Sequence, residues 1–404
     1  MDSFLLLASI LVFTSFLLIP LTRKLGAPIL LIVLAVGMLA GEDGFGGVQF
    51  DDFSIAYALG SLALAVILFG GGVETRMSAL KEARTPAVLL ATVGVVITTV
   101  IVGLAVVLIF RVSILEGLLL GAVVGSTDAA ATFLLIRQND VRLKPRLENT
   151  LVLESGINDP MAIFLTLVLT GLVNLQADFT VSSILSYLPV LVQQFGLGAI
   201  AGLGGGYALA WILNRLDLRA GIYPAMALAG AIAIFSGTSV LGGSGYLAAY
   251  LTGLVLRDRL KDSLSDRVVG FSEAMQWLSQ IALFLMLGLL VTPHLLPTIW
   301  VPAALTAVIL IVVARPVAVV SCLSCLGFSI REQAFVSWVG LRGAVPIFLA
   351  ILPVITPGPV TVDFFNIVFI VVVISLVVQG WSIAASARWL GVDRPDPNEG
   401  KAGP

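Results

Sequence analysis

Charged residues are scarce in this sequence, and so are cysteine and histidine. Lys, Arg, Asp and Glu make up 11% of the 404 residues, whereas a soluble domain carries about 25%, so the composition excludes an ordinary water-soluble protein. The net charge of −2 offers no basic surface, and we expect no nucleic-acid partner. The two cysteines, Cys322 and Cys325, would share one helix face, where simple packing is favoured over a redox pair or a metal site.

Long apolar runs occupy most of the chain instead. Hydrophobic residues make up 59% of it, and the mean hydropathy is +1.08. Such continuous runs are typical of membrane helices of about 20 residues, whereas a membrane barrel has segments of about ten residues with alternating polarity. The sequence therefore predicts an all-α polytopic membrane protein. Thirteen spans are expected, at residues 3–22, 27–41, 53–73, 85–110, 114–137, 147–173, 181–213, 221–238, 243–256, 270–292, 297–328, 333–355 and 362–390.

The basic residues predict how these spans are oriented. With the N-terminus outside, every Lys and Arg except Arg111, Arg315 and Arg342 falls in a cytoplasmic loop or in the C-terminal tail. The outer loops are acidic or neutral. Cytoplasmic loops of membrane proteins carry the excess of Lys and Arg. We therefore expect an external N-terminus and a cytoplasmic C-terminus.

The thirteen spans divide into six, one and six, which gives the two halves opposite orientations, as an inverted repeat requires. The fifth span of each half is interrupted by glycine and polar residues, and such paired interruptions point to a binding site near the membrane midplane. The predicted membrane domain, 1–390, therefore consists of a first repeat at 1–173, a linker helix at 181–213 and a second repeat at 221–390, followed by a short disordered tail at 391–404.

The two interrupted spans are the fifth and the twelfth. Residues 125–128, Gly-Ser-Thr-Asp, are typical of an unwound point followed by a new helix start. Asp128 would cap the second half-helix, which leaves backbone carbonyls near Thr127 to bind a cation. In the twelfth span, Arg342 would balance the negative end of the first half-helix. The alternatives are a simple polar kink and, for Arg342, a side chain that reaches the membrane surface.

The sixth span holds the densest polar cluster. Ser155 and Asp159 share one helix face, and Glu154 and Asn158 share the adjacent one. A carboxylate at membrane depth costs at least about 2.5–3.5 kcal/mol, so an ion or proton site is the first hypothesis for Asp159 and a satisfied structural acid the second. Hydroxyl and carboxylate oxygens suit a hard cation. For Glu154 we expect a structural role, paired with Arg315 of the eleventh span.

Three motifs stand out together: Gly-Ser-Thr-Asp-Ala-Ala at 125–130, Glu-Ser-x-x-Asn-Asp-Pro at 154–160 and Gly-Leu-Arg-Gly-Ala-Val-Pro at 340–346. They resemble the signatures of the monovalent cation:proton antiporter-1 family, and most closely its bacterial potassium/proton antiporters linked to cell-volume regulation. The resemblance covers all thirteen spans. It implies a thirteen-helix inverted-repeat fold, a homodimer in the bacterial inner membrane, and exchange at Asp159 with Ser155 and Thr127 as further ligands.

One position departs from this pattern. Related chains often carry an acid before the paired glycines of the third span, as Leu-Phe-Asp-Gly-Gly, whereas this chain reads Leu-Phe-Gly-Gly-Gly at 68–72. Glu74 follows one turn later. It either replaces the missing acid or is an interfacial charge beside Arg76.

Together these features predict a secondary antiporter rather than an enzyme, exchanging K⁺ or Na⁺ for H⁺ without a cofactor. Its partners would be the two ions, membrane lipid and a second copy of the chain. Asp159 would hold either the proton or the cation, and Asn158 stands where a second acid would be needed to move two protons, so we expect electroneutral exchange. A passive channel would need a filter-like repeat, which the sequence lacks. An anion transporter using Arg342 is disfavoured by the nearby acids Asp128, Glu154 and Asp159.

Overall fold

A computed structural model describes residues 2–20, 28–139, 141–176, 180–217, 219 and 221–393. Within these ranges the regular structure is helical, apart from two isolated bridges that join Gly41 to Val48 and Leu143 to Asp393. The predicted all-α class is therefore confirmed for the described part of the chain. The predicted tail beyond Asp393 lies outside the described residues.

The helices follow one another along the chain with short connections. The first half forms α1 (Asp2–Leu17), α3 (Ile29–Ala40), α4 (Phe53–Glu74), the 3-10 helix η1 (Met77–Leu80), α5 (Arg84–Leu89), the π turn η2 (Leu90–Gly94), α6 (Val95–Phe110), α7 (Ile114–Val123), α8 (Ala129–Gln138) and α9 (Pro145–Asn174). The remainder forms α10 (Val181–Leu185), α11 (Leu188–Arg215), α12 (Ile222–Val240), α13 (Gly245–Arg259), α14 (Asp262–Leu289), the 3-10 helix η3 (Pro293–Leu295), α15 (Leu296–Ile309), the π turn η4 (Leu310–Ala314), α16 (Arg315–Leu323), the 3-10 helix η5 (Ser324–Leu326), α17 (Ile330–Trp338), α18 (Ala344–Ile355) and α19 (Val362–Trp389).

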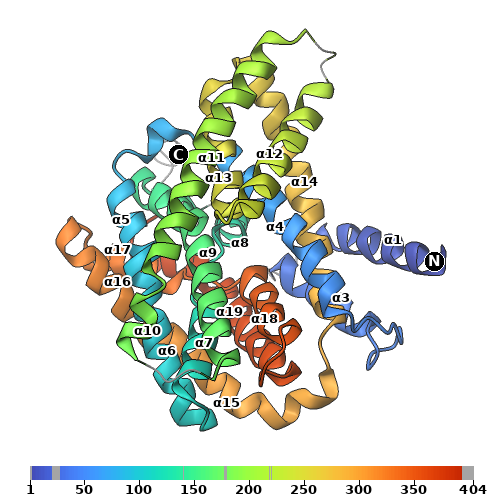
Figure 1. The fold of residues 1–404 in the computed structure, drawn as a ribbon, viewed down its shortest axis with the longest axis vertical. Helices are drawn as coiled ribbons and strands as arrows, with labels where there is room; N and C mark the ends of the chain where they lie inside the picture. Colours follow the sequence, from blue (N-terminus) through green and yellow to red (C-terminus); the bar gives the residue numbers. More distant parts are fainter. Residues whose placement is uncertain are drawn as a thin grey trace, which may run out of the picture.

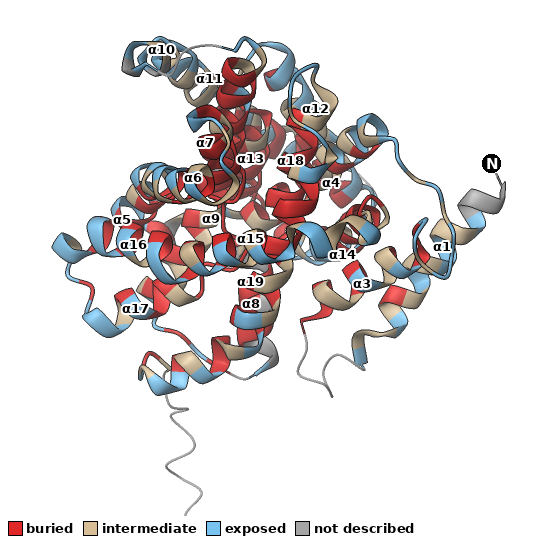
Figure 2. Cartoon of the chain, turned by 90° about the horizontal axis from the view of Figure 1, so that it is seen from below, coloured by how far each residue is buried: buried red, intermediate tan, exposed pale blue. Residues whose placement is uncertain are grey.

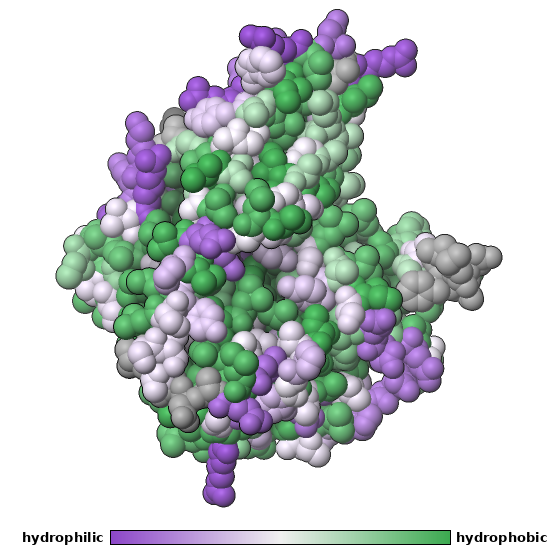
Figure 3. Space-filling view, in the orientation of Figure 1, coloured by the Kyte–Doolittle hydropathy of each residue, from purple (hydrophilic) through white to green (hydrophobic). Residues whose placement is uncertain are grey.

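Eight described helical segments are long and apolar enough to cross a membrane, and shorter apolar helices lie between them. The polytopic membrane class is thus supported by length and composition. Figure 3 shows hydrophobic side chains over much of one face of the molecule, with hydrophilic groups at its rim and in smaller clusters within the face. This distribution suits a protein whose sides contact lipid.

One expected boundary was wrong. The tenth span is expected at 270–292, but α14 begins at Asp262. Its first two turns carry charged residues, which a hydropathy pattern assigns to a loop although they are helical. The seventh span, 181–213, is longer than one crossing needs, which predicts a strong tilt or a break. The break is present, and the span is two helices. The second, α11, restarts at Leu188 with Pro189 in its first turn, where proline needs no amide hydrogen bond, whereas a longer continuous helix would place it in the interior.

The buried side chains concentrate where α4, α9, α13 and α18 meet, while α1 stands to one side of the body (Figures 1 and 2). Glycines bring α4 and α13 into backbone contact. A Cβ at Gly72 would fall 2.2 Å from the Tyr250 carbonyl oxygen, and one at Gly253 would fall 2.2 Å from the Phe69 carbonyl oxygen. Larger residues at either position would separate the two helices, so this contact fixes where α13 lies beside α9.

Candidate functional site

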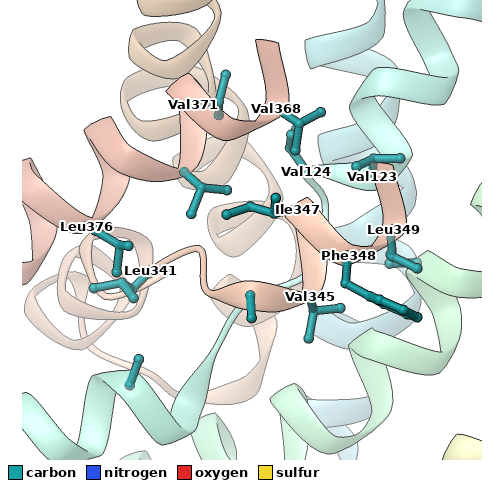
Figure 4. Close-up of a cluster of buried hydrophobic side chains, with 14 of the residues drawn as sticks. Val123, Val124, Leu341, Val345, Ile347, Phe348, Leu349, Val368, Val371 and Leu376 are labelled. Atoms are coloured by element: carbon teal, nitrogen blue, oxygen red, sulfur yellow. The ribbon is translucent and has the colours of Figure 1, made fainter. Parts of the chain in front are cut away.

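The two predicted interruptions are present and face each other. The backbone is not helical between α7 and α8, at 124–128, or between α17 and α18, at 339–343. The Asp128 amide donates a hydrogen bond of 2.8 Å to the Leu341 carbonyl, which joins the two breaks directly. Apolar side chains that include Val124, Val345 and Val368 surround this region (Figure 4). Unwound backbone inside a membrane protein is tolerated where it is enclosed by protein or lines a cavity.

Arg342 lies at the centre of this crossing and is 1% exposed. Its Nη1 donates to the carbonyls of Ser126, at 2.7 Å, and Gly125, at 3.3 Å. Its backbone amide donates to Ser375 Oγ. The alternative in which this side chain reaches the membrane surface is therefore wrong. The guanidinium neutralises carbonyls at the end of the other broken helix, α7, rather than those of its own half-helix α17.

Asp128 occupies the complementary position. Its Oδ1 accepts a hydrogen bond from the Ala131 amide, so it caps α8 as predicted. A Cβ at Gly343 would fall 1.8 Å from Asp128 Oδ2, so only glycine allows this carboxylate to lie against the start of α18. The positive end of a helix favours a carboxylate. Each broken helix thus compensates the partial charge of its partner.

Helix α9 presents its polar residues to the break in the α7–α8 pair. Ser155 Oγ donates to the Thr127 carbonyl at 3.0 Å, and Asn158 Nδ2 donates to Thr127 Oγ1 at 2.6 Å. A carbonyl oxygen has two lone pairs, so the Thr127 carbonyl retains capacity for a cation while it holds Ser155. The kink alternative does not account for these contacts, which fix Thr127 to the face predicted to bind the ion.

Asp159 is 4% exposed and lies within electrostatic range of Asp128 and beside Ser126. Three buried oxygen atoms here lack a hydrogen-bond partner in the described structure: Asp159 Oδ1, Asn158 Oδ1 and Ser126 Oγ. Burying polar groups without partners is costly. A cluster of carboxylate, amide and hydroxyl oxygens can be satisfied by a hard cation or, at the carboxylate, by a proton. A small cavity between the α7–α8 break and Arg315 is lined in part by Thr127, Asp128 and Leu151.

Glu154 pairs with Arg315, as its position in the sequence predicts. Glu154 Oε1 lies 2.6 Å from Arg315 Nη1, and the two side chains are 1% and 3% exposed. Arg315 follows the π turn η4, and a Cβ at Gly340 would fall 2.7 Å from Arg315 Nε. The pair thus ties α9 to α16, with the guanidinium packed against the break between α17 and α18.

Glu74 lies apart from the contacts described so far. It ends α4, is exposed, and accepts a hydrogen bond of 2.9 Å from Gln276 on α14. The side chain of Gln276 also fills the space beside Gly70, the position of the missing acid, since a Cβ there would fall 2.2 Å from its Nε2.

Sequence reasoning missed several buried polar residues. Two of them support the crossing: Ser375 Oγ accepts the Arg342 amide, and Gln379 holds the Trp338 carbonyl at the end of α17. The third, Gln276, lies beside Glu74 and Gly70, away from the crossing. The signal that could have found them was present, since polar residues recur at intervals of four in the apolar helices α14 and α19.

Comparison with known proteins shows the family of this chain. The family model for the transmembrane sodium/hydrogen exchangers matches residues 10–389. The chain belongs to this exchanger family. Its relatives include the K(+)/H(+) antiporter NhaP2 of Shewanella sp. strain ANA-3, which is 46% identical over 98% of this chain and 68% of that protein. The K(+)/H(+) antiporter NhaP of Alkalimonas amylolytica is 43% identical over 93% of this chain and 64% of that protein.

A solved exchanger has the same fold as this one. The sodium proton antiporter MjNhaP1 from Methanocaldococcus jannaschii matches with a TM-score of 0.82 over 95% of this chain and 97% of that protein, at 24% identity. At this level of identity the match concerns the fold alone.

Proposed function

We propose that this exchanger moves K⁺ or Na⁺ against H⁺ across the membrane, with Asp159 as the group that both ions compete for. The observation that carries this proposal is the buried Asp159 carboxylate, whose Oδ1 has no hydrogen-bond partner among the described residues and lies near Ser155 on α9 and Thr127 in the α7–α8 break. The 46% identity to a K(+)/H(+) antiporter supports the same reaction.

The residues around Asp159 have different roles in the cation-bound and proton-bound states. In the cation-bound state, the carboxylate, Ser155 Oγ and the Thr127 carbonyl supply oxygen ligands, and Asn158 keeps Thr127 in place. In the proton-bound state, the neutral carboxyl group needs no counter-ion. Because one carboxylate cannot hold both ions, loading one releases the other, and this competition couples the two flows. Arg342 balances charge at the crossing without occupying the site.

Thirteen membrane spans in an inverted repeat are the arrangement we propose for this mechanism. Three features recur seven spans apart. Capping boxes begin both α7, at Ser113, and α17, at Ser329. The helices before them contain the π turns η2 and η4, and both spans are then interrupted. Movement of one bundle against the other at the crossing would give alternating access.

The remaining proposals concern assembly and orientation. We propose a homodimer in a bacterial inner membrane, with the N-terminus outside and the C-terminus in the cytoplasm. The charge distribution supports the orientation. Leu6, Phe13 and Leu17 of α1 are exposed apolar side chains, and they support a surface covered by lipid or by a second copy.

Purified protein in liposomes with a trapped pH dye tests the function. Adding KCl, NaCl or LiCl outside in turn should drive proton efflux for the transported cation only, with choline chloride as the control. A cation that enters without moving protons would indicate a passive channel, and a response that follows the anion would indicate anion transport. The anion alternative has lost support because Arg342 and Arg315 are both engaged by partners within the protein.

Exchange is expected to be electroneutral. One proton for one cation on one carboxylate moves no net charge, so a membrane potential, which acts at about 2.3 kcal/mol per charge per 100 mV, has no effect on the end point. Asp128 is the other acid near the site, and its capping bond to the Ala131 amide supports a fixed structural role. Cation-driven proton movement is measured at zero and at an imposed potential, without a pH gradient. A voltage-dependent rate or end point would contradict one-for-one exchange and assign a second proton to Asp128.

A further inference from the structure

Two exposed arginines at the ends of α11 and α13 lie over neighbouring aromatic rings. The guanidinium carbon of Arg215 is 4.3 Å from the centre of the Trp211 ring, and that of Arg259 is 5.0 Å from the centre of the Tyr207 ring. Tyr207 and Trp211 are four residues apart on α11, so their rings are neighbours on one helix face. Within the described ranges neither guanidinium forms a salt bridge. Two positive charges are thus held close together at the surface.

A third cation, Lys261, is fixed beside them by hydrogen bonds that join the ends of α11 and α13. Asn214 Nδ2 donates to the Arg259 carbonyl at 2.7 Å, and Asn214 Oδ1 accepts from the Lys261 amide at 3.1 Å. Lys261 Nζ donates to the Asn214 carbonyl at 3.2 Å, and Arg259 Nη2 donates to the Tyr207 hydroxyl at 3.3 Å. Side chains that are already ordered lose less conformational freedom when a ligand binds.

The acids nearest in sequence do not neutralise these three cations. Asp258 accepts a hydrogen bond from a backbone amide, and Asp266 pairs with Arg257. Asp217 and Asp262 are exposed, and neither forms a salt bridge within the part of the chain that the structure describes. The three cations therefore remain available to an anion from outside the chain.

An apolar stripe on α11 leads away from the cations. Ile200, Leu203, Tyr207 and Trp211 are exposed, and their spacing places them on the one helix face that ends at Arg215. From position 200 to 215 the helix rises about 22 Å, a large part of the ~30 Å hydrocarbon core. Tyrosine and tryptophan are enriched at the level of the lipid headgroups. Figure 1 shows this end of α11 at the top of the molecule, where Figure 3 shows hydrophilic side chains above a hydrophobic face.

We propose that this surface binds an anionic phospholipid, whose phosphate is held by Arg215, Arg259 and Lys261 and whose acyl chains lie along the apolar stripe of α11. Guanidinium groups bind phosphate oxygens in a bidentate geometry, and they stack on aromatic rings. Basic pockets between helices on the cytoplasmic side of a membrane protein suit lipid headgroups, and this is the side on which we place the end of α11. A second copy packed on the same face would bring like charges together, because a twofold interface uses the same patch on both subunits.

Phosphatidylglycerol titrated into purified protein in a neutral detergent tests the site by thermal unfolding, because a ligand that binds the folded state raises the unfolding temperature. We expect a saturable rise with phosphatidylglycerol and little rise with phosphatidylcholine, whose headgroup has no net charge. Inorganic phosphate separates a lipid from a soluble anion. A rise with phosphate alone that equals the rise with phosphatidylglycerol would overturn the assignment to a lipid. The measurement does not involve exchange, so this proposal and the proposed function fail separately.

Arg215→Gln is the first variant, because this guanidinium donates no hydrogen bond within the described residues and its loss should not prevent folding. The apparent Kd for phosphatidylglycerol should rise about tenfold, the loss typical of one hydrogen bond to a charged group. In Arg215→Gln/Arg259→Gln the saturable rise should disappear. If the double variant does not fold, the Kd of the single variant decides.

Arg331→Gln is the matched control. Arg331 is an exposed arginine on α17 and forms no salt bridge within the described ranges, so the same chemical change there should leave the Kd at the wild-type value. Equal stabilisation of the wild type and of both Arg215 variants by phosphatidylglycerol would overturn the site. A double variant that dissociates into monomers but keeps the lipid response would assign this face to a second copy of the chain instead.

Discussion

Asp159→Asn should reduce cation-driven proton exchange to the level of protein-free liposomes while the protein remains folded. The amide keeps the shape of the side chain and two polar atoms, but it can neither titrate nor neutralise a cation. Because a neutral amide is cheaper to bury than a carboxylate, the unfolding temperature in detergent should be unchanged or higher. Exchange is measured with a trapped pH dye, and folding by size-exclusion chromatography and thermal unfolding of the same preparation.

Asp363→Asn is the control for this experiment. Asp363 lies in the first turn of α19 and is exposed, so the same chemical change there should leave exchange intact. Folded Asp159→Asn protein that still exchanges at the wild-type rate would contradict the assignment of Asp159. Loss of exchange together with loss of cation-induced thermal stabilisation would instead be the result expected of a binding site.

Much of this site was predictable because its signals are local in sequence. An interrupted apolar span needs only glycine and polar residues at its centre, and residues 124–128 and 339–343 are unwound as expected. The pairing of Glu154 with Arg315 could be predicted because few charged residues lie inside the spans, and a buried charge needs a partner of opposite sign. Ser155 and Asn158 both contact Thr127 because residues three apart are neighbours on the surface of a helix.

The rest depended on how distant helices cross. The sequence does not predict that Arg342 binds carbonyls of the other broken helix, because its hydrogen bond to the Ser126 carbonyl joins positions 216 residues apart. The same holds for Gln276, which fills the space beside Gly70 from α14, and for Tyr250, whose ring lies on Gly156. Such contacts arise from close helix packing at small residues, and their partners are visible only in the folded chain.

Glu154→Ala and Arg315→Ala should each lower the stability of the protein by about 3–5 kcal/mol, because each leaves one charge buried without its partner. The double replacement should cost less than the sum of the two, since no unpaired charge remains. The expected coupling is about 3 kcal/mol, at the upper end for residues in contact. The four proteins of the cycle are compared by denaturant unfolding in detergent, after refolding of each has been verified, because a coupling free energy requires a reversible transition.

Lys144 and Glu332 supply a matched control. This ion pair differs from the pair of Glu154 and Arg315 mainly in how far it is buried, and little in the distance between the charged atoms. Their charged atoms lie 2.9 Å apart, close to the 2.6 Å of Glu154 and Arg315, but the side chains are 49% and 15% exposed. Water screens such a pair, so its coupling should be at most about 1 kcal/mol. Equal couplings in the two cycles would show that burial adds nothing to the inner pair. A coupling near zero for Glu154 with Arg315 would redirect the search to Arg342, the other buried guanidinium within electrostatic range of Glu154.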